Sequence, residues 1–61
     1  MLLYIFNVTD LNGDGETSLK IEVTNKNNRF IDLIYCDYQT MMNSYINNPF
    51  SLYKDSKIIW T

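Results

Sequence analysis

Residues 10–15, Asp10-Leu11-Asn12-Gly13-Asp14-Gly15, fit two different structures, and the choice between them sets the architecture of the chain. One is the calcium-binding loop of an EF-hand, with oxygen ligands from Asp10, Asn12, Asp14 and Ser18. Such a loop needs a bidentate glutamate at its twelfth position, which is Ile21 here, because Glu22 comes one residue late. The loop lacks the group that closes the calcium shell, and we predict no metal site.

The alternative is the turn of a β-hairpin. Asn-Gly and Asp-Gly are the favoured central pairs of two-residue hairpin loops, because both positions adopt positive φ. The flanks have strand character, and residues 17–24 alternate polar and apolar side chains with period two. We predict a hairpin with a two-residue loop at Asn12-Gly13, a two-residue loop at Asp14-Gly15, or a four-residue loop across both.

Each of these loops places even-numbered residues of the first strand opposite odd-numbered residues of the second. One face of the hairpin is then apolar and is predicted to be the core face, with Leu2, Tyr4, Phe6, Val8, Leu19, Ile21 and Val23. The other face holds Leu3, Ile5, Asn7, Ser18, Lys20 and Glu22. A three-residue loop would instead place the even-numbered residues of the first strand on one face with Ser18, Lys20 and Glu22.

The segment after the hairpin predicts one amphipathic helix. Residues 25–28 form a polar connector whose asparagines can cap a helix. At helical spacing the following apolar side chains form one broad stripe: Phe30, Ile31, Ile34, Tyr35, Tyr38, Met41, Met42, Tyr45 and Ile46. Pro49 disfavours the α conformation of the residue before it, so the helix is expected to end at Asn47-Asn48.

The C-terminal residues complete the predicted fold. Residues 50–54 and 57–61 have strand length and β-favouring residues, with a turn expected at Asp55-Ser56. We therefore predict a single α+β domain over residues 1–61, of two layers. Its antiparallel sheet, ββα followed by one or two strands, is covered by the amphipathic helix. One edge strand of so small a sheet stays unpaired and offers a mode of association.

The composition excludes several classes of function. With no histidine and a single cysteine, Cys36, the chain has no Ser-His-Asp triad, Cys/His zinc site or internal disulfide. A net charge of −2 with five scattered basic residues argues against direct nucleic-acid binding. The apolar run Met1–Phe6 is far shorter than the ~20 residues of a membrane span and lacks the basic segment of a signal peptide. We predict a cytoplasmic protein without catalysis, cofactor or membrane contact.

Two acidic surfaces are candidates for contact with a partner protein. On the polar face of the predicted helix, Leu33, Cys36 and Thr40 form a thin ridge beside the carboxylates of Asp32 and Asp37. Isolated exposed apolar residues are also common on surfaces that bind nothing. The loop supplies the second surface. The predicted partner-binding residues are Asp32, Leu33, Cys36, Asp37, Thr40, Asp10, Asp14 and Glu16.

The predicted layout resembles a known family. A short first strand, a hairpin, a helix that ends in Tyr45-Ile46-Asn47-Asn48 and a short final strand resemble the T4-type phage antitoxins of the Dmd (discriminator of mRNA degradation) family. Members of that family bind and block bacterial RNase toxins of the RnlA/LsoA type in the host cytoplasm. The resemblance covers layout and length and includes no specific motif; the residues differ at most positions, including Arg29 and Phe30 where the predicted helix begins, and no binding residue is transferred. It implies a phage-encoded inhibitor of a host RNase toxin or of another nuclease with a basic groove.

Two other functions fit the same residues. The chain could be a small calcium-binding or structural module in which Asp10, Asn12, Asp14 and Ser18 hold the ion. It could also be a homodimeric structural protein that associates through an unpaired sheet edge.

Overall fold

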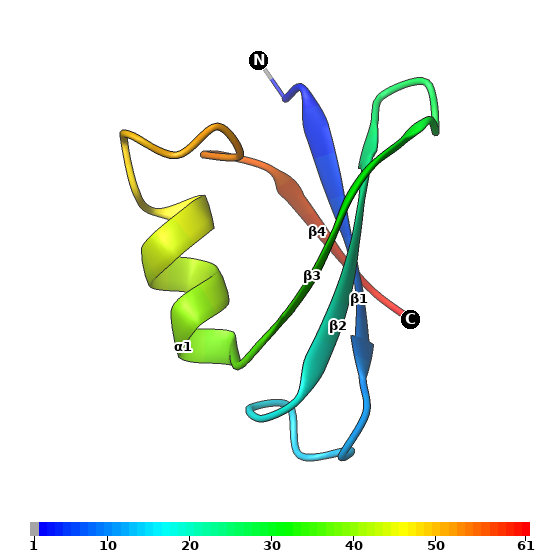
Figure 1. Ribbon diagram of the computed structural model, residues 1–61, viewed down its shortest axis with the longest axis vertical. Helices are drawn as coiled ribbons and strands as arrows, with labels where there is room; N and C mark the ends of the chain where they lie inside the picture. The colour runs from blue at the N-terminus through cyan, green and yellow to red at the C-terminus, as the bar shows by residue number, and fades with distance from the viewer. Residues whose placement is uncertain (1) are drawn as a thin grey trace.

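A four-stranded mixed sheet with one short helix on one face forms the fold in the computed structural model, which describes residues 2–61 (Figure 1). The strands are β1 (Tyr4–Asp10), β2 (Leu19–Asn25), β3 (Phe30–Cys36) and β4 (Lys57–Trp60), in the spatial order β3-β2-β1-β4. Between β3 and β4, α1 (Tyr38–Thr40) continues into the π-helical segment η1 (Met41–Ile46). The chain is α+β, as predicted. Met1, the first residue of the N-terminal apolar run, lies outside the described residues.

β1 and β2 form the predicted antiparallel hairpin. Even residues of β1 lie opposite odd residues of β2, as in the pairs Phe6–Val23 and Val8–Ile21. The predicted core face is confirmed, because these side chains are fully buried: Phe6, Val8, Leu19, Ile21 and Val23. We call this the inner face of the sheet, and the opposite one the outer face. Leu2, predicted on the core face, precedes β1 and is 49% exposed.

Residues 30–36 form the edge strand β3, so the prediction of a helix over this segment is wrong. The spacing of the apolar residues fits a helical stripe, but the residues themselves are largely β-branched or aromatic, which favours a strand. Pairing with β2 places Ile34 opposite Ile21, on the inner face. The inner-face side chains of β3 are thus placed by pairing with a neighbouring strand, not by the spacing of a helical stripe. Four residues of the predicted stripe are exposed: Phe30, Ile31, Tyr35 and Tyr38.

The polar connector before β3 is a hairpin turn. The Oδ1 atom of Asn25 accepts hydrogen bonds from the N–H groups of Asn27 (2.8 Å) and Arg29 (3.0 Å). Asn28 has a φ of 63°, a conformation that asparagine adopts more readily than most residues. The same asparagines that can cap a helix therefore reverse the chain between two strands.

The helix begins after Asp37, whose Oδ1 accepts the N–H of Thr40 at 2.7 Å in an N-cap. Its end has π geometry, because the Asn47 N–H donates to the carbonyl of Met42, five residues back, at 2.8 Å. Met41 is fully buried and anchors the helix to the inner face. Among residues 2–61 no helix has the length and apolar character needed to span a bilayer.

The C-terminal segment contributes one strand. Residues 50–56 form turns, and the turn predicted at Asp55-Ser56 is present, with a φ of 60° at Asp55 and a hydrogen bond from the Ser56 N–H to the Tyr53 carbonyl at 3.2 Å. β4 then runs parallel to β1, with Ile58 beside Phe6. The sheet is therefore mixed, and the prediction of an antiparallel sheet is wrong. The helix provides the long crossover that a parallel neighbour requires.

We predict that Met41→Ala lowers the free energy of unfolding by about 2–5 kcal/mol, because it leaves a cavity beneath the helix. The matched control is Met42→Ala, a change in the adjacent, only partly buried methionine, which should cost less than half as much. Urea denaturation followed by circular dichroism measures both. An equal or larger cost for Met42→Ala would show that Met41 is not the anchor.

Candidate functional site

The loop between β1 and β2 spans residues 11–18, longer than any of the predicted turns. The carboxylate of Asp10 accepts the N–H groups of Asn12 (3.3 Å), Gly13 (3.0 Å) and Gly15 (2.5 Å). Both glycines have a φ of 71°, where another residue would be strained. Because Asp10 attracts several following amides, the chain makes a wide bend, which the short-loop prediction missed.

Asp14 forms a second network of the same kind. Its carboxylate accepts the Thr17 hydroxyl (2.6 Å), the Thr17 N–H (2.8 Å) and the Glu16 N–H (2.9 Å). These hydrogen bonds, led by the Thr17 hydroxyl, lower the pKa of Asp14 from 3.8 to about 2. A depressed carboxyl pKa means that the network stabilises the fold above pH 3.8, and that this contribution is lost as the pH falls toward 2.

The calcium alternative meets two structural obstacles. Strands, not helices, flank the loop. The oxygens of Asp10 and Asp14, its main ligands, already accept backbone and hydroxyl hydrogens. Within residues 2–61, no three Cys, Asp or Glu side chains are grouped so as to hold a metal ion.

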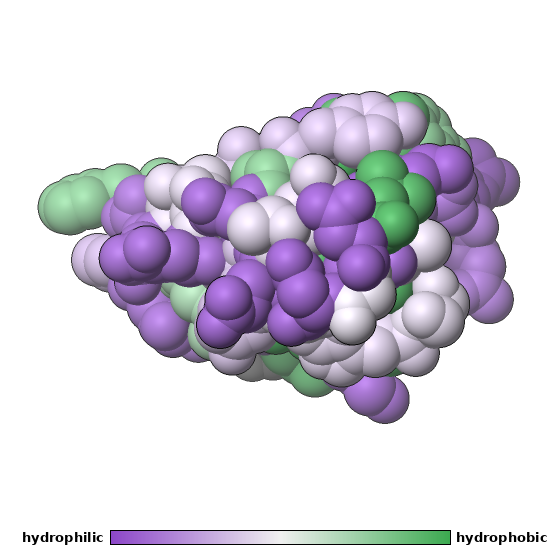
Figure 2. All heavy atoms as spheres, turned by 90° about the horizontal axis from the view of Figure 1, so that it is seen from below, coloured by the Kyte–Doolittle hydropathy of each residue, from purple (hydrophilic) through white to green (hydrophobic). Residues whose placement is uncertain are grey.

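The two predicted acidic surfaces meet at one end of the sheet. β2 and β3 pair with Cys36 opposite Leu19, which brings Asp37 to the end of the β1–β2 loop. There the Tyr38 N–H donates to the Glu16 carbonyl at 2.6 Å and ties the start of the helix to the loop. We call the carboxylates gathered here the acidic end: Asp10, Asp14, Glu16 and Asp37. Seen from this side, hydrophilic side chains cover much of the surface (Figure 2).

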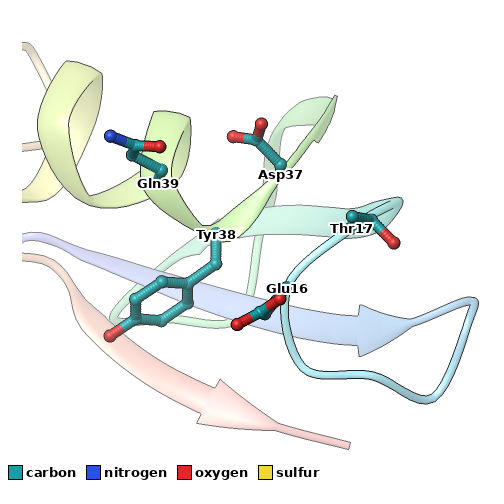
Figure 3. A pocket seen from close by; sticks show the side chains of 5 residues that line it. All are labelled: Glu16, Thr17, Asp37, Tyr38 and Gln39. Atoms are coloured by element: carbon teal, nitrogen blue, oxygen red, sulfur yellow. The ribbon is translucent and has the colours of Figure 1, made fainter.

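A shallow pocket of about 320 Å³ opens at the acidic end. It is lined by Glu16, Thr17, Asp37, Tyr38 and Gln39. In Figure 3 the side chains of Glu16 and Tyr38 lie on one side of the helix start, and that of Asp37 points to the other side. The pocket thus has a carboxylate on each flank, with an aromatic ring beside one of them.

The aromatic ring of the pocket belongs to a stacked pair. Tyr38 and Trp60 lie with ring centroids 6.2 Å apart and an interplanar angle of 18°. They are 41% and 48% exposed, so both rings can contact a partner. Carboxylates beside aromatic faces suit cationic side chains, which form charge-assisted hydrogen bonds with the former and cation–π contacts with the latter.

The other predicted contact residues lie apart from this pocket or serve the fold. Asp32 and Leu33 occupy the middle of β3 on opposite faces: Asp32 accepts the hydroxyl of Tyr53 at 3.0 Å, while Leu33 is 42% exposed. Thr40 donates its N–H to the Asp37 cap. The predicted ridge is therefore wrong as a single surface, because alternation along a strand separates residues that a helix would align.

The surroundings of two predicted contact residues, Cys36 and Asp32, limit the chemistry of their side chains. Burial, and to a lesser extent the carboxylate of Asp37, raises the pKa of the half-buried Cys36 thiol. The thiol therefore stays protonated at neutral pH and is a poor nucleophile. Burial, with the hydrogen bond to Asp32, raises the pKa of Tyr53 to about 12, so Asp32 is held by a neutral phenol.

The sequence interpretation missed the aromatic pair. Tyr38 belongs to the predicted core stripe and Trp60 only to a predicted strand, and nothing in their spacing indicates that they stack. Their contact follows from the parallel pairing of β4 with β1, which no local pattern reveals. Thr17 and Gln39 were likewise outside the predicted site.

No family model, curated protein or solved structure matches this chain. The resemblance to the Dmd family therefore stays a prediction from layout, and the observed layout departs from the predicted one at β3.

We predict that millimolar calcium leaves the melting temperature unchanged, because a ligand that does not bind the folded chain cannot stabilise it. Differential scanning calorimetry in calcium and in chelator makes the comparison, with magnesium as the control divalent ion. A melting temperature that rises with calcium but not with magnesium would restore the calcium-binding alternative.

Proposed function

We propose that this chain is a small phage-encoded inhibitor, of the antitoxin type, that binds a host RNase toxin or defence nuclease and performs no catalysis. The acidic end would occupy the basic groove in which the nuclease binds RNA. The pocket flanked by Glu16 and Asp37 is the single observation that carries this proposal.

The distribution of charge supports a basic partner. The acidic end gathers four of the seven acidic residues of the chain, whereas four of the five basic residues lie elsewhere: Lys26, Arg29, Lys54 and Lys57. The fifth, Lys20, follows Leu19 on β2 and lies beside the acidic end. Nucleases that bind RNA carry clustered lysine and arginine for the phosphates. A surface of opposite sign would accelerate association with such a groove and select against acidic partners.

The aromatic pair supports a specific contact in addition to attraction between charges. Tryptophan and tyrosine are enriched among the residues that dominate binding energy at protein interfaces. Tyr38 and Trp60 are about half exposed and hold each other in place by stacking. A guanidinium or ammonium group of the partner could lie over these rings with its charge toward Glu16.

The backbone of the acidic end is held in advance of binding. Backbone N–H groups that donate hydrogen bonds to the carboxylates of Asp10, Asp14 and Asp37 fix the loop and the helix start. A surface ordered before association loses less conformational entropy on binding than a flexible one. Asp10, Asp14 and Thr40 therefore support the surface, and Glu16 and Asp37 are the expected contacts.

We predict that the purified chain protects RNA from an RNase toxin of the RnlA/LsoA type, and that the double variant Glu16→Gln, Asp37→Asn protects it less well. Both changes remove charge at nearly constant shape, and asparagine remains a good N-cap. Loss of two exposed ion pairs should raise the half-inhibitory concentration by about 2- to 10-fold. Titration of RNA cleavage at low and high salt measures this, and the difference should shrink at high salt.

The matched control is Glu22→Gln, Asp55→Asn, which removes the same charge away from the acidic end and keeps a residue that tolerates the positive φ of position 55. It should inhibit as well as the native chain. Lack of protection by the native chain would refute the proposed function. Equal weakening by the two double variants would show that net charge, not the pocket, governs binding.

A further inference from the structure

β3 leaves one side of the sheet open along its whole length. It is an edge strand of seven residues, and within Phe30–Cys36 there is no lysine, arginine or proline. Its exposed side chains include Phe30 (63%), Leu33 (42%) and Tyr35 (63%). Natural sheets usually protect such an edge with charges, proline or a covering segment, since an open apolar edge can pair with another strand.

Two features define which part of β3 can accept a new strand. The register with β2 shifts at Val23/Thr24, so Ile31 forms a bulge and regular geometry is confined to residues 32–36. Asp32, the one charged residue of β3, is held within its own chain: its Oδ2 accepts the Tyr53 hydroxyl (3.0 Å) and its Oδ1 accepts the Leu33 N–H (2.8 Å). The Leu33 N–H faces the open edge, so on pairing it would exchange the Asp32 carboxylate for a carbonyl of the new strand.

We propose that two copies of this chain pair through β3, antiparallel, so that the two sheets join into one continuous sheet of eight strands. The two-fold axis would pass through the sheet at Ile34 and keep both helices on the same side. Each copy would present the same strand to the other, as a two-fold interface requires. Of each acidic end, Asp37 would lie beside the shared edge; the dimer is argued from β3 and does not rest on the proposed function.

The charges of the chain favour an antiparallel pair of copies. At one end of the sheet lies the acidic end, and at the other lie Lys26 and Arg29 in the β2–β3 turn and Lys57 at the start of β4. Antiparallel pairing brings the Arg29 end of each β3 next to the Asp37 end of the other. Opposite charges then meet twice, whereas a parallel arrangement would bring like charges together.

Side-chain pairing selects the register at Ile34. It uses only the regular residues 32–36 and places Ile34 opposite Ile34 on the inner face. On the outer face it places Leu33 opposite Tyr35, an aliphatic–aromatic pair of the kind that stabilises sheets. A register centred on Asp32 would oppose two carboxylates, and one centred on Leu33 would pair Tyr35 with the bulged Ile31.

The first test is the mass of the native chain in solution. Sedimentation equilibrium over a range of concentrations should show twice the chain mass at the higher ones, and a melting temperature that rises with concentration. Tyr35→Lys places a charge on the paired edge and should give a monomer. The matched control Leu52→Lys changes a residue that is also exposed (69%) but lies in the turns before β4, and should leave the dimer intact.

The second test fixes the register by disulfide formation. Leu33→Cys and Tyr35→Cys are made separately in a Cys36→Ser background, mixed and oxidised. Residues directly opposite across two strands lie within disulfide range, so an equimolar mixture should give a Leu33→Cys–Tyr35→Cys disulfide well above the two-fold excess over either homodimer that random pairing produces. Ile59→Cys in the same background, on β4, controls for random collision and should give no comparable product.

Each remaining outcome overturns the proposal. A native chain that sediments as a monomer at all concentrations excludes the dimer. Disulfides formed mainly between two Leu33→Cys chains exclude the register at Ile34. A monomeric chain whose toxin inhibition is lost in Tyr35→Lys would assign the β3 edge to the nuclease instead of a second copy.

Discussion

The carboxylate of Asp10 and that of Asp14 organise this molecule by accepting backbone N–H groups from the residues that follow them. Ordering a loop of this length costs conformational entropy, which these hydrogen bonds offset. With them, the loop returns the chain so that Leu19 lies opposite Asp10 and the alternation of both strands is in phase. The phase then places Phe6, Val8, Leu19, Ile21 and Val23 on one face, where they are fully buried.

The same loop also positions the surface to which we assign the function. Its Glu16 carbonyl accepts the Tyr38 N–H, so the loop and the start of the helix form one unit. Asp37 caps the helix beside it, and the ring of Tyr38 lies against Trp60. Asp10, Asp14 and Asp37 accept backbone N–H groups and thus hold in place Glu16, which lines the pocket. The carboxylates that accept backbone N–H groups and those proposed to contact a partner share one end of the sheet because both depend on this loop.

The hairpin and its core face could be predicted from the sequence, because strict alternation over residues 17–24 leaves one arrangement of faces for loops of even length. The length of the loop could not, since it depends on which amides the Asp10 carboxylate accepts. The secondary structure of residues 30–36 was ambiguous for a different reason. A short apolar run fits both the helical and the strand period, and pairing with β2 makes this segment a strand. The helical spacing of residues 30–46 predicts Asp37 on a helical face, although an aspartate is also an N-cap signal.

The site, like the fold, could be predicted from the sequence only where the signal is local. The acidic residues of the loop and Asp37 could be recognised from short stretches of sequence. Their meeting at one end depends on the β2–β3 pairing, and the Tyr38–Trp60 stack depends on the parallel pairing of β4 with β1. Both are contacts between residues distant in the sequence, which composition and spacing do not encode. Alternation along β3 separated Asp32 and Leu33 for the same reason.

We infer that hydrogen bonds to Asp10 and Asp14 make residues 11–18 as rigid as the strands they connect. Backbone ¹⁵N relaxation of the native chain measures this rigidity residue by residue. Order parameters near the ~0.85 of rigid backbone throughout residues 11–18 would agree with the account. Values below about 0.6 in this loop, beside rigid strands, would contradict it, because a mobile loop could not hold Glu16 against the start of the helix.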